Sequence, residues 1–223
     1  MDNSEAYRRV YLRIRDLVKD PGVTEVDVPT CPGWTVKDLI GHLAAFFTVA
    51  RTADDPGKAF GPDWGDKEVA ARKDRSLQEC LDEWETELEK ADEMFGSHLG
   101  PVVVSDALAH EQDIRTALDE PGARDDANIV PAVEMALSFA EHKAKGAGVP
   151  ALRVVTPDID RQLGEGEASA TLRTSTFELF RAIQGRRTTD QVRSLDWDGD
   201  PEPWLDIFFI FGPTEQVVEE STA

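Results

Sequence analysis

The chain has 223 residues, enough for a main domain with a smaller one, and 40% of them are hydrophobic, which suffices for a packed core. Its 24 lysines and arginines are outnumbered by 44 aspartates and glutamates, so the formal net charge is -20. This charge repels phosphate backbones and anionic lipid surfaces, and we expect no nucleic-acid and no membrane partner. Acidity of this kind is typical of a solvated surface.

The first twenty residues mix charges and contain no apolar run, so we expect no signal peptide, and no later run approaches the length of a membrane span. The cysteines, Cys31 and Cys80, lie far apart and form no C-x-x-C motif, which indicates neither a disulfide framework nor a cysteine metal site. A reducing cytoplasm fits this pattern. Nothing in the sequence predicts an oligomeric state.

Hydrophobic periodicity predicts a first helix near residues 3–19, which ends at Pro21-Gly22. A second helix over 35–50 begins with a capping box formed by Thr35 and Asp38. The segment CPGW, residues 31–34, is predicted to be the rigid turn before this helix. Trp34 is predicted to be a core residue.

Residues 53–75 are highly charged and contain several prolines and glycines, which predicts a long loop, one that covers the site described below. Ser76 and Glu79 form a capping box for a helix over 76–98. Two further helices are predicted over 103–118 and 127–145. These helices make an all-α bundle.

The pattern changes near residues 147–151. Residues 151–157 and 168–175 alternate like short strands, with a glycine-rich turn at 164–166 between them. A helix from Ser175 to Gly185 follows, with further helical pieces over 190–197 and 201–211 and a frayed tail after Gly212. We therefore expect a mostly α, α+β protein, with a helical bundle over 1–148 and a small α+β domain over 149–223.

Three residues of metal-ligand type fall on the inward sides of two predicted helices. His42 is spaced with Leu39 and Phe46 on an apolar face. Asp106 precedes His110 by one helical turn, and His110 lies on the apolar stripe of its helix. Two nitrogens and one oxygen converging between helices match an open zinc site of the catalytic type.

Spacing alone leaves other interpretations open. An inward histidine such as His42 is more often a hydrogen-bonded core residue than a ligand. The pair Asp106 and His110 also fits an ion pair on a helix surface, and a D-x-x-x-H match arises easily by chance.

Longer motifs favour the metal site. VPTCPGWTVKDLIGHL, residues 28–43, and DALAHEQDIRTAL, residues 106–118, together strongly resemble the DinB-like superfamily, in particular the mycothiol-dependent maleylpyruvate isomerase family. The resemblance implies a four-helix bundle in which His42, Asp106 and His110 bind a divalent metal, usually zinc. The isomerase has Glu where this chain has Asp106, and Asp also coordinates zinc.

Residues 151–212 resemble the small C-terminal domain of this family, so the resemblance extends from about Glu5 to about Gly212. The resemblance implies that mycothiol or a similar low-molecular-weight thiol is a co-substrate. A thiol that binds a divalent metal is deprotonated, and its thiolate is a ready nucleophile. The thiol would add to a double bond of a small electrophile. An isomerase would then allow rotation and eliminate the thiol, whereas an S-transferase would release the adduct.

Supporting roles are predicted for four more residues. Asp113, three residues after His110, is placed to orient a metal ligand, unless it is an exposed acid paired with Arg115. Three arginines are predicted to bind a substrate carboxylate: Arg181, Arg186 and Arg187. Alternatively, these arginines balance the charge of so acidic a protein.

Two other functions stay open at this point. Water in the open metal position would make the protein a metal-dependent hydrolase. A member of the fold that only binds a small molecule would need no catalysis. The sequence does not name the electrophilic substrate.

Overall fold

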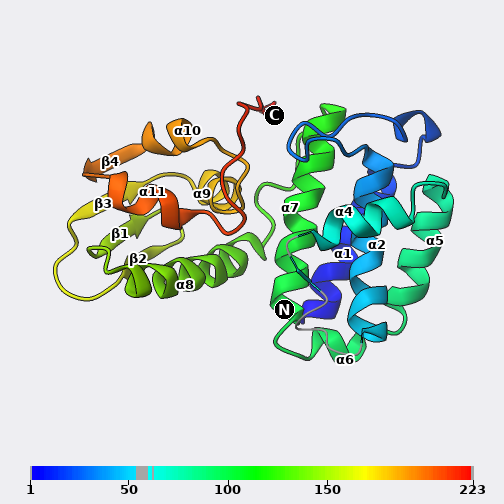
Figure 1. Cartoon of the computed structure of the whole chain (residues 1–223), viewed down its shortest axis with the longest axis horizontal. Helices are drawn as coiled ribbons and strands as arrows, with labels where there is room; N and C mark the ends of the chain where they lie inside the picture. Colours follow the sequence, from blue (N-terminus) through cyan, green and yellow to red (C-terminus); the bar gives the residue numbers. More distant parts are fainter. Residues whose placement is uncertain (1, 54–59, 62, 222–223) are drawn as a thin grey trace. The chain divides into compact units, whose positions relative to one another are not determined.

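The computed structural model describes residues 2–53, 60–61 and 63–221. Two compact units make up the chain (Figure 1). The first is formed by residues up to Pro121 with a short C-terminal piece from Glu220, and the second by Gly122–Glu219. In the described part of the first unit all the helices and strands that can be named are helices, and the second unit carries a sheet, so the predicted mostly α, α+β class is confirmed.

Four long helices form the bundle of the first unit. α1 packs against α7, and α2 packs against α5. The structure confirms the predicted capping boxes at Thr35 before α2 and at Ser76 before α5. The elements of this unit are α1 (Asn3–Leu17), the 3-10 helix η1 (Pro21–Val23), α2 (Val36–Thr52), α4 (Trp64–Ala71), α5 (Leu77–Leu88), α6 (Asp92–Phe95) and α7 (Gly100–Leu118).

Aromatic side chains fill the centre of the bundle. The Trp84 indole is fully buried and donates a hydrogen bond of 3.1 Å to the Tyr7 hydroxyl. Tyr7 also meets the rings of Phe47 and Phe95 at 5.1 and 5.4 Å between centroids. Burial raises the pKa of Tyr7 well above its usual value. This core joins α1, α2 and α5.

An ion triad holds α7 against α1. Glu111 is fully buried and accepts two hydrogen bonds from the Arg13 guanidinium, at 2.8 and 2.6 Å. Arg115, one turn later on α7, donates a third at 2.9 Å. A buried carboxylate needs such partners because its desolvation is costly. The triad therefore fixes the rotation of α7, the helix that carries Asp106 and His110.

The second unit combines helices with a four-stranded sheet in the order β2-β1-β3-β4. β1 pairs antiparallel with β2 and parallel with β3, and β3 pairs antiparallel with β4. α8 packs against α9 and α11. The elements are α8 (Ile129–Ala147), β1 (Leu152–Val155), β2 (Asp160–Leu163), β3 (Ala170–Arg173), α9 (Thr176–Ile183), α10 (Thr189–Arg193), β4 (Asp196–Gly199) and α11 (Glu202–Phe208).

Along the chain, the division between the units falls at Pro121-Gly122, earlier than the boundary expected at residues 148–149. α8 belongs to the second unit because its buried face packs on α9 and α11, and because Arg161 of β2 donates to Glu134 and Glu141 of α8, each at 2.8 Å. Helical periodicity shows that a helix has an apolar face. It does not show which core that face enters.

Three predicted elements also need correction. The expected loop 53–75 contains the helix α4, while residues 54–59 and 62 of that loop lie outside the described residues. The helix expected over 76–98 ends at Leu88, and α6 follows after a break. The last two residues of the expected helical piece 190–197 belong instead to β4, which runs from Asp196 to Gly199. The strand β2 was not predicted, because short charged segments such as Asp160–Leu163 lack the alternating pattern.

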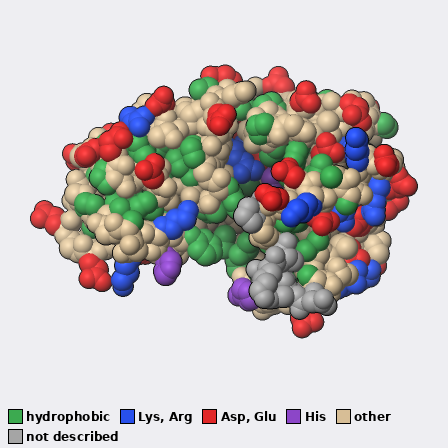
Figure 2. Space-filling view, viewed as in Figure 1, with side chains coloured by type: hydrophobic (Ala, Val, Ile, Leu, Met, Phe, Trp, Pro, Cys, Tyr) green, Lys and Arg blue, Asp and Glu red, His purple; other side chains and the backbone are tan. Residues whose placement is uncertain are grey.

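Two expectations drawn from composition concern the surface. Figure 2 shows Asp and Glu side chains scattered over the visible face rather than gathered in one patch, which suits a solvated acidic surface. Within the described residues, no helix combines the length and apolar character needed to cross a membrane.

Candidate functional site

The turn before α2 sets the position of His42. Gly33 has φ +86°, a conformation that glycine adopts without strain, and the Trp34 amide donates to the Cys31 carbonyl at 3.1 Å. The Thr35 amide donates to the Asp38 carboxylate at 3.0 Å and closes the capping box. The start of α2 is thus fixed on both sides, and His42 follows two turns later.

α2 and α7 bring the three predicted metal ligands together. His42 Nε2 lies 3.9 Å from Asp106 Oδ2, and His110 Nε2 lies 3.4 Å from Asp106 Oδ1. One donor atom from each residue falls within 4.8 Å of the others. Both histidines are only 6% exposed, whereas the Asp106 side chain is 26% exposed. The group therefore reaches solvent on the side of Asp106.

The donor set fits a divalent metal ion. Zinc ligands about 2.1 Å from the ion in a tetrahedral arrangement lie roughly 3.4 Å from one another, close to the observed separations around Asp106. Imidazole and carboxylate donors suit zinc, and nickel or iron would also fit. Three protein ligands leave a fourth position for an exogenous group.

Charge at this cluster favours protonated His110 in the metal-free protein. Burial by itself lowers the pKa of His110, but the charge and hydrogen bonding of Asp106, together with hydrogen bonds to Asp113 and Cys31, raise that pKa well above its usual value. A proton on Nε2 faces Asp106 in the place that a metal ion would take. Metal binding at this site would therefore release a proton.

Asp113 is buried and lies on the far side of His110. Its Oδ2 atom is 3.0 Å from His110 Nδ1, and the side chain has no exposed surface. Cys31 Sγ donates to the same oxygen at 3.6 Å, so the turn before α2 reaches α7 here. The alternative of an exposed acid paired with Arg115 does not describe this position, because Arg115 donates to Glu111 instead.

Aromatic rings surround His42. Its ring centroid lies 5.0 Å from that of Trp34 and 4.7 Å from that of Trp64 at the start of α4. Phe46, one turn further along α2, stacks on Phe60 at 4.5 Å. The predicted loop 53–75 therefore does lie against the site, within its described part. Trp34 is half-buried against His42 rather than in the bundle core where it was expected.

The three arginines predicted to contact a substrate carboxylate all belong to the second unit. Arg181 on α9 is fully buried, and Arg187 is buried with two hydrogen bonds to Glu178 at 2.7 and 2.8 Å. Arg186 is half-buried and donates to the Gln184 carbonyl at 2.6 Å. Of the three, Arg186 keeps the most exposed side chain.

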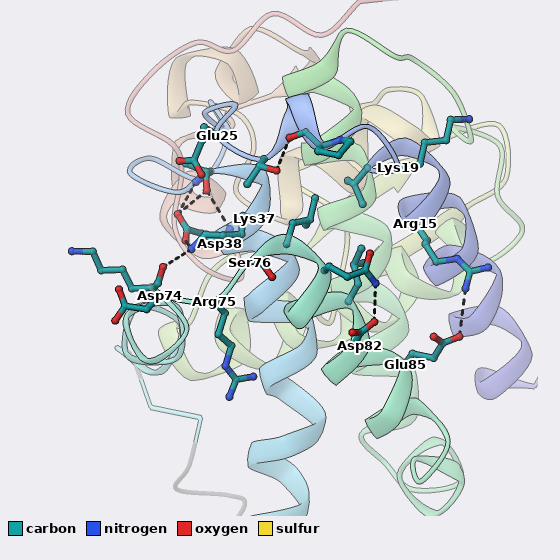
Figure 3. Close-up of a pocket in the computed structure, with 18 of the residues that line it drawn as sticks. Arg15, Lys19, Glu25, Lys37, Asp38, Asp74, Arg75, Ser76, Asp82 and Glu85 are labelled. Atoms are coloured by element: carbon teal, nitrogen blue, oxygen red, sulfur yellow. Dashed lines mark hydrogen bonds and ion pairs between the residues drawn. The ribbon is translucent and has the colours of Figure 1, made fainter.

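A separate cavity of about 940 Å³ opens between α1, the start of α2 and α5 (Figure 3). Two ion pairs lie within its lining: Lys37 is 3.2 Å from Asp38, and Arg15 is 3.4 Å from Glu85. Lys37 also donates to the Lys73 carbonyl. None of the candidate metal ligands lines it. This cavity is distinct from the metal-ligand cluster.

Comparisons with known proteins agree with this architecture. Residues 7–98 match the family model of the mycothiol maleylpyruvate isomerase N-terminal domain. Two similar solved structures are those of the mycothiol-dependent maleylpyruvate isomerase and of its variant with one histidine changed to alanine. Each of the two matches has a TM-score of 0.52 and 13% sequence identity, and each alignment covers 82% of this chain and 88% of the isomerase chain. No curated protein matches the chain.

The fold is thus mostly helical with a small sheet, and it is similar to that of the mycothiol-dependent maleylpyruvate isomerase, as the sequence motifs predicted. The family likeness is limited to residues 7–98, which resemble the mycothiol maleylpyruvate isomerase N-terminal domain. His42 lies inside the matched segment, whereas Asp106 and His110 follow it. At 13% identity, the likeness to the solved structures is one of fold.

Two contributors to the site were missed at the level of sequence. Cys31 was interpreted as a turn residue, yet its thiol joins the hydrogen bonds around Asp113. Trp64 was assigned to an irregular loop, yet it contacts His42. The run WGDKEVAA, residues 64–71, has a glycine at its second position and lies in a segment with many prolines, glycines and charges, so its composition did not indicate a short helix.

Proposed function

We propose that the protein binds one divalent metal ion, most naturally zinc, through His42, Asp106 and His110, and uses a low-molecular-weight thiol such as mycothiol to transform a small electrophile. The reaction class is a thiol-dependent isomerisation or S-transfer. The observation that carries the proposal is the convergence of two imidazole nitrogens and one carboxylate from α2 and α7. The family match supports the thiol.

Each residue of the cluster has a distinct task. His42 and His110 present Nε2 to the same point as the Asp106 carboxylate, which also faces solvent. Asp113 accepts a hydrogen bond from His110 Nδ1, which fixes the tautomer whose Nε2 lone pair is available for coordination. The surrounding rings exclude water from the side of His42 that faces α4.

A bound divalent ion supplies Lewis acidity that keeps a coordinated thiol deprotonated at neutral pH. The exposed side of Asp106 is where the thiol and the electrophile have access. Addition of the thiolate to a carbon-carbon double bond forms one carbon-sulfur bond and moves a proton to the neighbouring carbon. Loss of the thiol after rotation gives the isomer, and release of the adduct gives the S-conjugate.

Contact with a carboxylate of such a substrate stays a prediction for Arg181, Arg186 and Arg187. Arg187 is already bonded to Glu178, and Arg181 has no exposed surface. Arg186, which is half-buried, is the strongest of the three predicted candidates. We also place the protein in the cytoplasm, because a reducing compartment suits the free cysteines Cys31 and Cys80.

Elemental analysis and thiol titration test the proposal. Protein prepared without a metal-binding tag is expected to contain about one zinc per chain, and His42→Ala and His110→Ala are expected to lose it. Mycothiol added to cobalt-substituted protein should produce a sulfur-to-metal absorption band. Glutathione and cysteine serve as comparison thiols of different shape.

The outcomes separate the remaining functions. Equal metal content in wild type and in both histidine variants would refute the metal site. Metal binding without thiol coordination, combined with turnover of ester or amide substrates, would instead identify a hydrolase. Metal binding with neither behaviour would leave a protein that only binds small molecules.

A further inference from the structure

We infer that α4 is a brace for the metal site: its Trp64 indole, together with Trp34, holds the His42 ring in the orientation that coordinates metal, so that metal affinity depends on α4. This inference rests on His42 being a ligand, as proposed above. Trp34 and Trp64 act here as positioning residues. Neither side chain offers a metal ligand of its own.

The first observation is the packing of His42. Indole rings contact it from the turn before α2 and from the start of α4, at centroid distances of 5.0 and 4.7 Å. The edge of the His110 ring lies 5.0 Å away at an interplanar angle of 77°. A histidine side chain turns about two torsions, and neighbouring rings on several sides restrict both. The position of Nε2 is therefore set by Trp34, Trp64 and His110 together.

The second observation is that α4 is fastened at both ends. At its start, the Trp34 indole nitrogen donates to Asp66 at 3.1 Å. Just after its end, the buried Arg72 donates to the carboxylate of Glu83 on α5, at 2.9 and 2.6 Å. It also donates to Glu68 of α4, at 2.6 Å to the carboxylate and 3.2 Å to the carbonyl. These contacts hold the short helix against α2 and α5.

Glycines allow this close approach. A Cβ atom at Gly65 would lie 3.2 Å from the Trp34 ring and 3.5 Å from His42 Nδ1. A Cβ atom at Gly41, the residue before His42, would lie 3.3 Å from the Arg72 side chain. Both ends of α4 therefore touch α2 where only hydrogen fits comfortably. α4 therefore packs closely against the part of α2 that carries His42.

The test measures zinc affinity in full-length protein by competition with a chromophoric chelator. Trp64→Leu is expected to weaken zinc binding by about 10–100-fold, the usual effect of losing a group that orients a metal ligand. Trp64→Phe keeps a ring and should lose less. Zinc titration should also change the tryptophan emission of the wild type, and this change should shrink in both variants.

Trp84→Phe is the matched control, because Trp84 is a core indole that packs on Tyr7 and Tyr11 and makes no ring contact with His42. It should lower the midpoint of urea unfolding more than Trp64→Phe does, yet leave the zinc affinity unchanged. The reverse order, in which zinc affinity follows stability, would overturn the inference.

Gly65→Ala provides a second variant that should remain folded, because alanine favours a helix over glycine. Its methyl group displaces the Trp34 ring and crowds His42, so zinc should bind more weakly although α4 is retained. Wild-type affinity in both Gly65→Ala and Trp64→Leu would refute the brace while leaving the metal site intact. A wild type that binds no zinc would refute the proposed function itself, and the brace with it.

Discussion

Replacement of Asp113 by alanine tests how the buried residues behind His110 support the site. Asp113 has no exposed surface, and its Oδ2 atom accepts from His110 Nδ1 at 3.0 Å and from the Cys31 thiol at 3.6 Å. The alanine variant leaves both donors without this acceptor in a buried place. His110 is then free to turn or to change its tautomer.

The size of the effect follows from these contacts. A group that orients a metal-bound histidine typically contributes about 10–100-fold to metal affinity. This factor corresponds to roughly 1.4–2.8 kcal/mol of binding free energy. The loss of a hydrogen bond to a charged group also destabilises the metal-free fold, by about 1.5–3 kcal/mol. We expect both losses in Asp113→Ala.

Chelator competition gives the zinc affinity, and urea unfolding of metal-free protein gives the stability. Asp113→Asn keeps the shape and one acceptor oxygen, so it should lie between wild type and Asp113→Ala in both measurements. Unchanged zinc affinity in Asp113→Ala, with a lowered unfolding midpoint, would show that Asp113 serves the fold alone. That result would contradict its assigned role.

Three other predictions concern residues described above. Asp106→Ala should reduce zinc content sharply with little change in the unfolding midpoint, and Asp106→Glu should restore much of the binding; an ordinary ion pair would leave zinc content unchanged in both. The double variant Cys31→Ser/Cys80→Ser should keep zinc and any thiol-dependent activity, because the proposed nucleophile is the added thiol and a serine hydroxyl at position 31 can still donate to Asp113; loss of activity with zinc retained would contradict this. Burial raises the pKa of Glu83, but hydrogen bonds from Arg72 and Thr48 and the nearby arginine charges lower it overall. Its ionised form therefore stabilises the fold above the unfolded-state pKa, and this stabilisation is lost as the pH falls through the folded-state pKa. Glu83→Gln should flatten that acid-side decline in urea midpoints; an unchanged slope would count against the assignment.

The helices that carry the candidate ligands could be predicted from the sequence because their signals are local. Thr35 and Asp38 mark the start of α2 by a capping box, and the spacing of His42 with Leu39 places it inward. That α2 and α7 lie side by side could be predicted only from the resemblance of two motifs to a known family. Periodicity alone left a core histidine and a surface ion pair as alternatives.

Other features could not be predicted because they depend on contacts between distant segments. The assignment of α8 to the second unit follows from Arg161 and from the buried face of α9, which no local pattern encodes. The role of Trp64 follows from its distance to His42, across a stretch of chain with loop-like composition. Such relations appear only when tertiary packing is known.

The triad of Glu111 with Arg13 and Arg115 bears on how this scaffold can change over evolution. Glu111, the residue directly after His110, links α7 to α1 through its hydrogen bonds with these arginines. None of the candidate metal ligands takes part in the triad. The packing of α7 on α1 thus has a support that is separate from the candidate metal ligands. Substitutions at His42, Asp106 or His110 leave this link between the two helices in place. A lineage built on this fold can therefore change the residues of the candidate metal site while it keeps the packing of α7 on α1 that the triad provides.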